Sequence, residues 1–382
     1  MYKAYKFRIY PNDEQRIFIN KCFGCSRFVY NYYLDIAKKD KNINACSYIK
    51  DYSNNLKYIY PFLQEVDSIL IRKSIFNLQD SYNNFFNLGY GYPKYKSKNN
   101  RNSYTTNAIY NSYKDKNYCN IELDLINRKV KLPKLKWIDC RGYRNINNIN
   151  GRIISATISK EPNGKYYVSL VYELPRLNIS NIIPTSIVGI DIGVKKLLTL
   201  SDGITIDNNK YIEKYQKRIN RCNRELSRKK RGSKNFYKCK HKLAVLYSKL
   251  KNARNYYIHN ITKKITDNYD IITCEKLNTK NMITKKSNLS KKIIDATFYE
   301  IIRQLQYKSK YKNKYFYQVD TYYPSSQTCS VCNNIDNKYK NLTERIYNCS
   351  KCHNTIDRDL NASINIMFKG LKLYMNDNLV SI

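Results

Sequence analysis

Short alternation of apolar and polar residues opens the chain and then changes to a helical spacing. Residues 2–10, YKAYKFRIY, alternate as a strand does, and residues 11–14, PNDE, then supply a turn and a helix cap. From Gln15 onward apolar residues recur at helical spacing, which predicts a helical region. Residues 89–102, GYGYPKYKSKNNRN, end it with Gly, Pro and a basic run, so we expect a boundary there.

The period-two pattern returns after this boundary. Between residues 103 and 174 the runs RKVKLPKLKWI, RIISATISK and KYYVSLVYEL are separated by Asn and Gly turns. This pattern predicts a small β-barrel or sheet. Residues 180–186, SNIIPTS, are typical of a linker.

Strands and helices alternate in the rest of the chain. Residues 187–203, IVGIDIGVKKLLTLSDG, predict a buried strand, a tight turn and a second strand. Two further apolar runs, at residues 269–278 and 314–320, also predict strands. Two long basic helices and one amphipathic helix with an Asp cap are predicted at residues 211–229, 235–266 and 295–312. The alternation predicts an α/β domain.

Length and charge narrow the class of protein. A chain of 382 residues is long enough for two or three domains. Its 69 Lys and Arg against 30 Asp and Glu give a net charge of +39, which favours a polyanionic partner, with nucleic acid the first candidate. No apolar run reaches the ~18 residues of a spanning helix, and the start lacks a signal peptide's apolar block. We therefore expect no membrane partner and a soluble, intracellular protein.

Four of the 12 cysteines form two CxxC pairs near the C-terminus. Cys329 and Cys332 make one pair, and Cys349 and Cys352 make the other. Four thiolates at this spacing are typical of a tetrahedral zinc site in a reduced compartment. Because such a site has no open position, we expect one structural Zn²⁺, with His353 beside it rather than bound to it.

Three carboxylates stand where an α/β sheet would bring them together. Asp191 lies within the strand VGIDIG, and Glu275 lies at the end of the apolar run in ITCEKLN. Asp359 stands at the start of the helix RDLNASINI. Such a cluster can hold two Mg²⁺ ions ~4 Å apart for phosphodiester hydrolysis. The alternative is that each is a separate surface acid or a helix cap. Asp357, two residues earlier, fits a capping or supporting role.

Other motifs carry less chemistry. The only three histidines, His241, His259 and His353, form no HxH pair, which disfavours a transposase with a tyrosine nucleophile and a histidine-bound metal. Signatures of serine hydrolases and of P-loop enzymes are missing as well. The CFGC run at Cys22 and Cys25 lies in an apolar helical stretch without a second pair nearby, so these residues are interpreted as core cysteines.

At this point the residues resemble a known family, the TnpB proteins of bacterial insertion sequences and their eukaryotic and viral relatives called Fanzor. The segments that carry the resemblance run in family order over nearly the whole chain: YKFRIYP, FGCSRFVYNYYL, GYPKYKSK, GIDIGVKKLLTLSDG, ARNYYIHNITKKI, CEKLNTKNM, KKIIDATFYEIIRQLQYKSK, VDTYYPSSQTCSVC and DRDLNASINI. The resemblance implies an RNA-guided DNA endonuclease, with a RuvC-like domain of RNase H fold interrupted by a zinc-binding insertion.

The resemblance also implies an α+β multidomain fold and an assignment of roles. A β-barrel called the wedge, containing an inserted helical recognition domain, would precede the nuclease domain. The implied segments are residues 1–14 (first wedge strand), 15–102 (helical recognition), 103–185 (wedge), 186–320 (nuclease), 321–356 (zinc-binding insertion) and 357–382 (last nuclease segment and tail). Asp191, Glu275 and Asp359 would be the catalytic, metal-binding acids, and the four cysteines the zinc ligands. Two positions depart from the family pattern: Lys276 stands where many relatives carry an acid, and His353 stands where a glycine commonly follows the last cysteine.

The same resemblance implies two partners, a guide RNA and a double-stranded DNA target beside a short motif. It also implies that the protein works as a monomer with one RNA. Basic residues between 219 and 242 could form a solvated helix pair, but in the context of this resemblance they favour a surface that follows the phosphates of the guide–target duplex. The residues expected to contact nucleic acid are Lys73, Phe76, Asn77, Gln79, Arg218, Arg221, Arg228, Lys229, Lys230, Arg231, Lys234 and Arg254. Two rival functions stay open, a catalytically silent RNA-guided DNA-binding regulator and, less favoured by the D, E, D order of the acids, a strand-transferring transposase. The site of action is expected to be the cytoplasm, or the nucleus if the host is eukaryotic.

Overall fold

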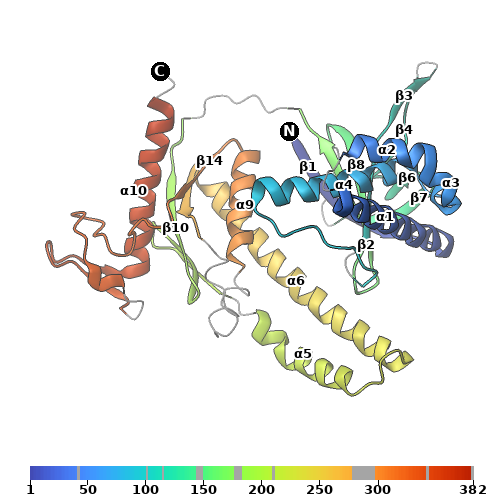
Figure 1. Ribbon diagram of the computed structural model, residues 1–382. Coiled ribbons are helices and arrows are strands. Elements are labelled where there is room, and N and C mark those ends of the chain that lie inside the picture. Colours follow the sequence, from blue (N-terminus) through green and yellow to red (C-terminus); the bar gives the residue numbers. More distant parts are fainter. Residues whose placement is uncertain are drawn as a thin grey trace. The chain divides into compact units, whose positions relative to one another are not determined.

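A computed structural model describes most of the chain, which divides into two compact units, Met1–Arg176 and Leu177–Ile382 (Figure 1). The described residues are 1–40, 44–99, 102–113, 116–142, 149–175, 183–208, 211–277, 297–340 and 344–379. Outside these ranges lie part of the expected linker at 180–186, part of the CEKLNTKNM segment, and Asp295, the expected helix cap.

The first unit is built on a seven-stranded antiparallel sheet in the order β2-β8-β9-β1-β7-β6-β5. Its first strand in sequence, β1, lies at the centre, and Phe7 and Ile9 on its buried face contribute to the core. The strands are β1 (Tyr2–Tyr10), β2 (Asn102–Asn107), β5 (Glu122–Asp124), β6 (Lys129–Leu132), β7 (Lys136–Arg141), β8 (Arg152–Lys160) and β9 (Tyr166–Glu173), with a separate hairpin of β3 (Tyr110–Tyr113) and β4 (Lys116–Cys119).

The expected barrel is not present as a closed sheet. Within the described ranges β2 pairs only with β8, and β5 pairs only with β6, so the two end strands are not joined. Closing a barrel requires the two end strands to pair along their length, and β5 has only three residues. The alternating pattern could not reveal this difference, because an open sheet with one buried face and a barrel produce the same alternation.

Helices between β1 and β2 complete the first unit: α1 (Asp13–Asp40), α2 (Ala45–Asp51), a π-helical turn (Tyr52–Leu56), α3 (Lys57–Ile59), a 3₁₀ turn (Pro61–Gln64) and α4 (Ser68–Leu88). At the start of α1 the side-chain oxygen of Asn12 accepts a bond from the Gln15 N–H at 2.8 Å, and that of Gln15 accepts one from the Asn12 N–H at 3.1 Å. This reciprocal cap is the one that the PNDE turn predicts. Gly89, with φ of 64°, ends α4 in the left-handed conformation.

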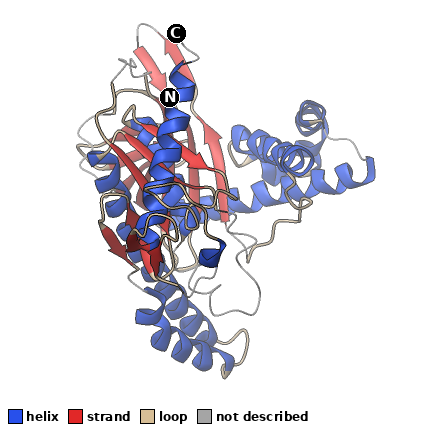
Figure 2. Ribbon diagram, turned by 90° about the vertical axis from the view of Figure 1, so that its left-hand side faces the viewer, coloured by secondary structure: helices blue, strands red, loops and turns tan. Residues whose placement is uncertain are grey.

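The second unit contains a five-stranded sheet in the order β12-β11-β10-β13-β14. Strands β12, β11 and β10 are antiparallel neighbours, whereas β13 and β14 continue the sheet parallel to β10. The strands are β10 (Ile187–Ile192), β11 (Lys196–Leu200), β12 (Thr205–Asp207), β13 (Ile271–Glu275) and β14 (Tyr315–Val319). Figure 2 shows the strands of both units in red and their helices in blue.

The helices of this unit are α5 (Tyr211–Ser227), α6 (Lys234–Asn268), α9 (Phe298–Tyr311) and α10 (Arg358–Leu379). One core joins the apolar residues of β10, β11 and β13 to α6 and α9, and α10 packs on β10, β13 and β14. Two glycines permit the close approach of α10: a Cβ on Gly189 would lie 2.0 Å from the Ser363 carbonyl oxygen, and one on Gly370 would lie 1.8 Å from Cγ2 of Thr273. Between β14 and α10 lies a small insertion with a 3₁₀ turn (Asn337–Lys340) and a hairpin of β15 (Ile346–Asn348) and β16 (Thr355–Asp357).

Candidate functional site

Two of the expected acids lie at the carboxyl ends of adjacent parallel strands. Gly189 of β10 is in register with Thr273 of β13, and both residues contact α10. Because side chains alternate across a strand, residues two positions further on return to the same face. Asp191 and Glu275 occupy those positions and therefore lie side by side on the α10 face of the sheet.

The third acid is supplied by the first turn of α10. The Asp357 carboxylate accepts bonds from the N–H groups of Asp359 at 3.0 Å and Leu360 at 3.1 Å, which makes it the helix cap. Asp359 is free of this capping duty and is partly buried. Since α10 lies directly on Gly189, the beginning of the helix comes to the same edge of the sheet as Asp191.

The electrostatics of the site reflect the closeness of these acids. Burial, followed by the charges of Glu275 and Asp359, raises the pKa of Asp191 to about 8, while Arg358 opposes the shift. Burial also raises the pKa of Glu275, against a hydrogen bond from Ser325. Three carboxylates in a partly buried place, two of which disfavour the charge of the third, are a fitting donor set for a hard divalent cation such as Mg²⁺.

Two arginine side chains lie beside the acids. The Arg358 side chain is buried at 5% exposure, and its guanidinium donates to the Glu344 carbonyl at 3.3 Å and to the Ser326 hydroxyl at 3.4 Å. Arg345 lies 3.6 Å from a carboxylate oxygen of Asp359. These charges offset part of the repulsion between the acids.

Sequence reasoning missed Ser325 and two asparagines of α10. The Ser325 hydroxyl donates to a carboxylate oxygen of Glu275, and the buried side-chain amides of Asn361 and Asn365 bind the loop that carries Ser325. The available signal was the i, i+4 spacing of Asn361 and Asn365 in RDLNASINI, which places two amides on one face of a helix.

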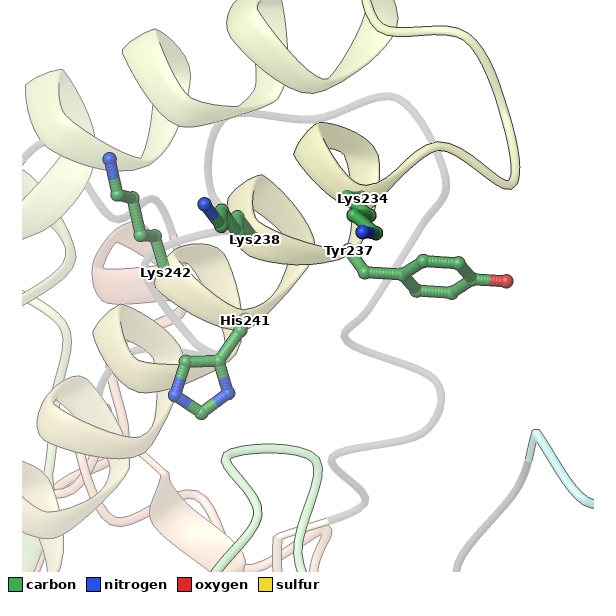
Figure 3. A pocket seen from close by; sticks show the side chains of 5 residues that line it. All are labelled: Lys234, Tyr237, Lys238, His241 and Lys242. Carbon is green, nitrogen blue, oxygen red and sulfur yellow. The ribbon is translucent and has the colours of Figure 1, made fainter.

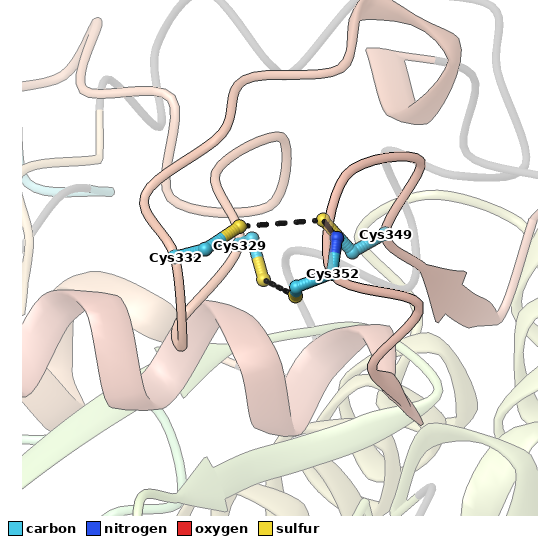
Figure 4. Close-up of side chains that lie close together, drawn as sticks. All are labelled: Cys329, Cys332, Cys349 and Cys352. Carbon is cyan, nitrogen blue, oxygen red and sulfur yellow. Dashed lines mark hydrogen bonds between the residues drawn. The ribbon is translucent and has the colours of Figure 1, made fainter.

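The four cysteines of the insertion come together in one cluster (Figure 4). All four sulfur atoms lie within 4.8 Å of one another, with Cys329 to Cys352 at 3.6 Å and Cys332 to Cys349 at 3.5 Å. Four sulfurs at about 2.3 Å from a tetrahedral Zn²⁺ would be about 3.8 Å apart, so the cluster fits this ion. Backbone N–H groups point at the sulfur of Cys349, with those of Lys351 and Cys352 at 3.4 and 3.5 Å, and such bonds favour the thiolate that a metal requires.

The two CxxC turns are built alike. In each turn the first cysteine's carbonyl accepts a 3.0 Å bond from the residue after the second cysteine, which is Asn333 in one turn and His353 in the other. Both residues are left-handed, with φ of 60° and 57°. This conformation explains why glycine would suit position 353, and it leaves His353 as a turn residue outside the cluster of sulfur ligands.

The residues expected to contact nucleic acid are divided between the two units. Lys73, Asn77 and Gln79 are partly exposed on α4, and Phe76 is 41% exposed. The others lie on α5, on α6 and in the turn that joins these helices. Of these, the exposed residues are Arg218, Arg221, Arg228, Lys229, Lys230, Arg231 and Lys234, whereas Arg254 is partly buried.

A basic hollow at the start of α6 was not predicted in this form. Lys234, Tyr237, Lys238, His241 and Lys242 line it, and Figure 3 shows their side chains leaving successive turns of the helix. The spacing of three and four residues puts all five on neighbouring positions of one helical face. Three ammonium groups beside an exposed phenol ring can bind phosphate and stack on a base.

Three family models match parts of the chain. Residues 169–286 match the OrfB family described as a probable transposase, residues 298–366 match the Cas12f1-like TNB domain, and residues 1–40 match a helix-turn-helix domain. In this chain residues 1–40 contain strand β1 and the single long helix α1.

Similar proteins extend over nearly the whole chain. The putative RNA-guided DNA endonuclease InsQ of Escherichia coli is 29% identical over 392 residues, covering 96% of this chain and 92% of that protein. A putative RNA-guided DNA endonuclease of Streptomyces pristinaespiralis is 29% identical, covering 97% and 89%. The chain is therefore similar to the OrfB family over residues 169–286, and to proteins named putative RNA-guided DNA endonucleases over nearly its whole length.

Solved structures share its α+β fold. The Cas12f1 chain of an sgRNA and target DNA complex superimposes with a TM-score of 0.58 at 15% identity, covering 96% of this chain and 98% of that one. A mini-RNA-guided endonuclease, CRISPR-Cas phi3, gives a TM-score of 0.50 at 9% identity, with 97% and 92% covered. None of the helices described here is long and apolar enough to cross a membrane.

Proposed function

We propose that this chain is an RNA-guided DNA endonuclease, which cuts DNA by metal-dependent hydrolysis at a target paired to a guide RNA beside a short adjacent motif. The observation that carries the proposal is that Glu275 and Asp359, which lie in distant parts of a chain with net charge +39, both raise the pKa of Asp191. The names of the relatives support the same function.

The cutting site belongs, in this proposal, to a RuvC-like domain of RNase H fold. Support comes from the sheet order β12-β11-β10-β13-β14, in which an antiparallel three-strand meander continues into two parallel strands. The acids stand at the carboxyl ends of the two adjacent parallel strands, where open α/β sheets place their ligands.

Each acid has a defined task. Asp191, Glu275 and Asp359 would hold two Mg²⁺ ions, and when bound these ions would activate a water and stabilise the leaving oxygen. Asp357 holds the start of α10 through its capping bonds to the main chain, and so holds the backbone of Asp359 in place. The buried Arg358 lowers the cost of keeping three carboxylates close before a cation arrives.

The remaining partners are assigned by charge and chemistry. One Zn²⁺ held by the four cysteines would have no free coordination position and would be structural. The exposed cations of α5 and α6 would follow the phosphates of a guide–target duplex, and the first unit would bind guide RNA and the adjacent motif as the helical and wedge parts of the protein. One monomer would act with one guide RNA, in the cytoplasm or, in a eukaryotic host, the nucleus.

The deciding experiment supplies the purified protein–RNA complex with a plasmid library in which a guide-matched site adjoins randomised bases. Wild-type protein in Mg²⁺ should produce breaks only at the matched site, and sequencing the cut ends would reveal the adjacent motif. Asp191→Ala should lower cutting by at least about 10³-fold, since it removes a ligand shared by the metal site. Glu213→Gln removes an exposed carboxyl of α5 and serves as the matched control.

Three outcomes of this cutting experiment distinguish the candidate functions. Guide-dependent breaks that require Mg²⁺ and Asp191 support the nuclease. Binding at the matched site without breaks in any divalent metal would replace it by the RNA-guided regulator. Joining of DNA ends to a new strand would replace it by a strand-transferring transposase.

A further inference from the structure

The loop between β14 and the first CxxC turn places a hydroxyl on one of the acids. Ser325 is 4% exposed, and its hydroxyl donates to carboxylate oxygen Oε1 of Glu275. Glu275 is the last residue of β13, and its side chain has three rotatable bonds that strand pairing does not fix. A buried hydroxyl on one oxygen restricts those rotations and leaves the second oxygen available for other partners.

Helix α10 holds this loop by two side-chain amides. The Asn365 amide donates to the carbonyl of Ser325 at 2.8 Å and to that of Thr328 at 2.6 Å. The Asn361 amide donates to the Thr328 carbonyl at 2.7 Å and accepts from the Ser330 N–H at 2.9 Å. Both asparagines are at most 2% exposed, so these bonds are shielded from competing water.

The same helix thus supplies one acid and supports another. Asp359 lies in the first turn of α10, Asn361 stands two residues later, and Asn365 follows one turn after Asn361. The carbonyl of Ser325 is bonded to α10 and its hydroxyl is bonded to Glu275, so this one residue links the helix to the end of β13. Movement of the loop would release the Glu275 carboxylate.

We propose that Ser325 is a positioning residue that orients the Glu275 carboxylate for divalent metal binding, and that Asn365 holds Ser325 in place. This inference rests on the proposed function, because it assigns Glu275 to the metal site. Loss of such supporting partners typically costs about 10–100-fold in metal affinity or activity.

The test measures metal affinity directly. The full-length, zinc-loaded protein without RNA would be titrated with Mn²⁺ and the free ion followed by electron paramagnetic resonance, with Mg²⁺-dependent cutting by the protein–RNA complex measured in parallel. Ser325→Ala should weaken Mn²⁺ binding by about 10-fold or more and raise the Mg²⁺ concentration for half-maximal cutting by a similar factor. Ser325→Thr, which retains the hydroxyl, should stay within about threefold of wild type.

Thr321→Ala is the matched control. Its hydroxyl donates to the residue that follows the same strand, but to the carbonyl of Lys276 at 2.8 Å rather than to a carboxylate. We expect it to leave Mn²⁺ affinity unchanged. Ser325→Ala should also have no additional effect on Mn²⁺ affinity in a Glu275→Gln background, since the serine acts through that carboxylate.

The possible outcomes separate the inference from the function. Unchanged Mn²⁺ affinity in Ser325→Ala, or an equal loss in Thr321→Ala, would overturn the positioning role. If wild type fails to cut any matched DNA while Ser325→Ala still weakens Mn²⁺ binding, the proposed function fails and the positioning role stands. Should Ser325→Ala not fold, as judged by circular dichroism and zinc content, Ser325→Cys keeps the volume with a weak donor and takes its place.

Discussion

At the scale of single residues, the acidic cluster has an energetic cost that can be measured without any substrate. Asp191 has a pKa raised to about 8 by burial and then by Glu275 and Asp359. Its ordinary value in an unfolded chain is about 4. The folded protein therefore retains a proton that the unfolded chain releases across this window, so stability contributed by Asp191 is lost as the pH rises from about 4 to about 8.

We predict that, without Mg²⁺ but with zinc retained, the midpoint of thermal unfolding of wild type falls between pH 5 and pH 8 more steeply than that of Asp191→Asn. The amide cannot ionise and so removes this contribution. Differential scanning calorimetry at several pH values measures the slope. Glu213→Gln should keep the wild-type slope, and parallel curves for wild type and Asp191→Asn would contradict the raised pKa.

At the scale of elements, the contact between α10 and the sheet decides where Asp359 lies. A Cβ on Gly189 would be 2.0 Å from the Ser363 carbonyl oxygen and 2.5 Å from the Met367 nitrogen, both of which are backbone atoms. Neither can move without the whole helix. The absence of a side chain at Gly189 therefore determines how close α10, and with it Asp359, lies to the strands that carry Asp191 and Glu275.

Gly189→Ala should destabilise the second unit by about 1–3 kcal/mol or more, because overpacking displaces a complete helix. It should also lower cutting more than its effect on stability explains, since Asp359 moves with α10. Chemical denaturation and cutting assays measure the two effects. Gly24→Ala is the control: Gly24 lies within α1 with no neighbour inside 4 Å of an added Cβ, and alanine should there be neutral or stabilising by up to about 1 kcal/mol.

Local patterns predicted most elements, whereas contacts between distant elements could not be obtained in the same way. The Asn12 cap, the end of α4 at Gly89 and the strands carrying Asp191 and Glu275 follow from short-range rules of turns and periodicity. The open form of the first sheet depends on which strands pair, which alternation does not encode. The same limit hid Ser325, whose partner lies 50 residues earlier in the chain.

At the scale of the whole molecule, charge is the dominant property. A net charge of +39 with exposed Lys and Arg on α5 and α6 should make binding to RNA strongly dependent on salt, because each neutralised phosphate releases counterions. The hollow at the start of α6 concentrates three of these lysines on one helical face.

We predict that replacing Lys234, Lys238 and Lys242 together by Gln lowers the slope of log Kd against log salt by about 2–3, at roughly 0.7–0.9 for each phosphate that is no longer neutralised. Filter binding or fluorescence anisotropy with guide RNA over a salt series measures the slope. A pair of exposed lysines at the other end of the same helix, Lys263 and Lys264, supplies the control. Equal changes in both variants would show that the hollow has no special part in binding.

The construction of the cysteine insertion bears on how the chain can vary. Cys329, Tyr339, Tyr347 and Cys349 form a separate small core, and α10 grips the adjoining loop through main-chain atoms of Ser325, Thr328 and Ser330. Main-chain atoms are the same in every residue type. The residues of the insertion between these contacts can therefore diverge or be exchanged between relatives, as long as the four cysteines, the Ser325 hydroxyl, the two asparagines and the path of the backbone beneath them are kept.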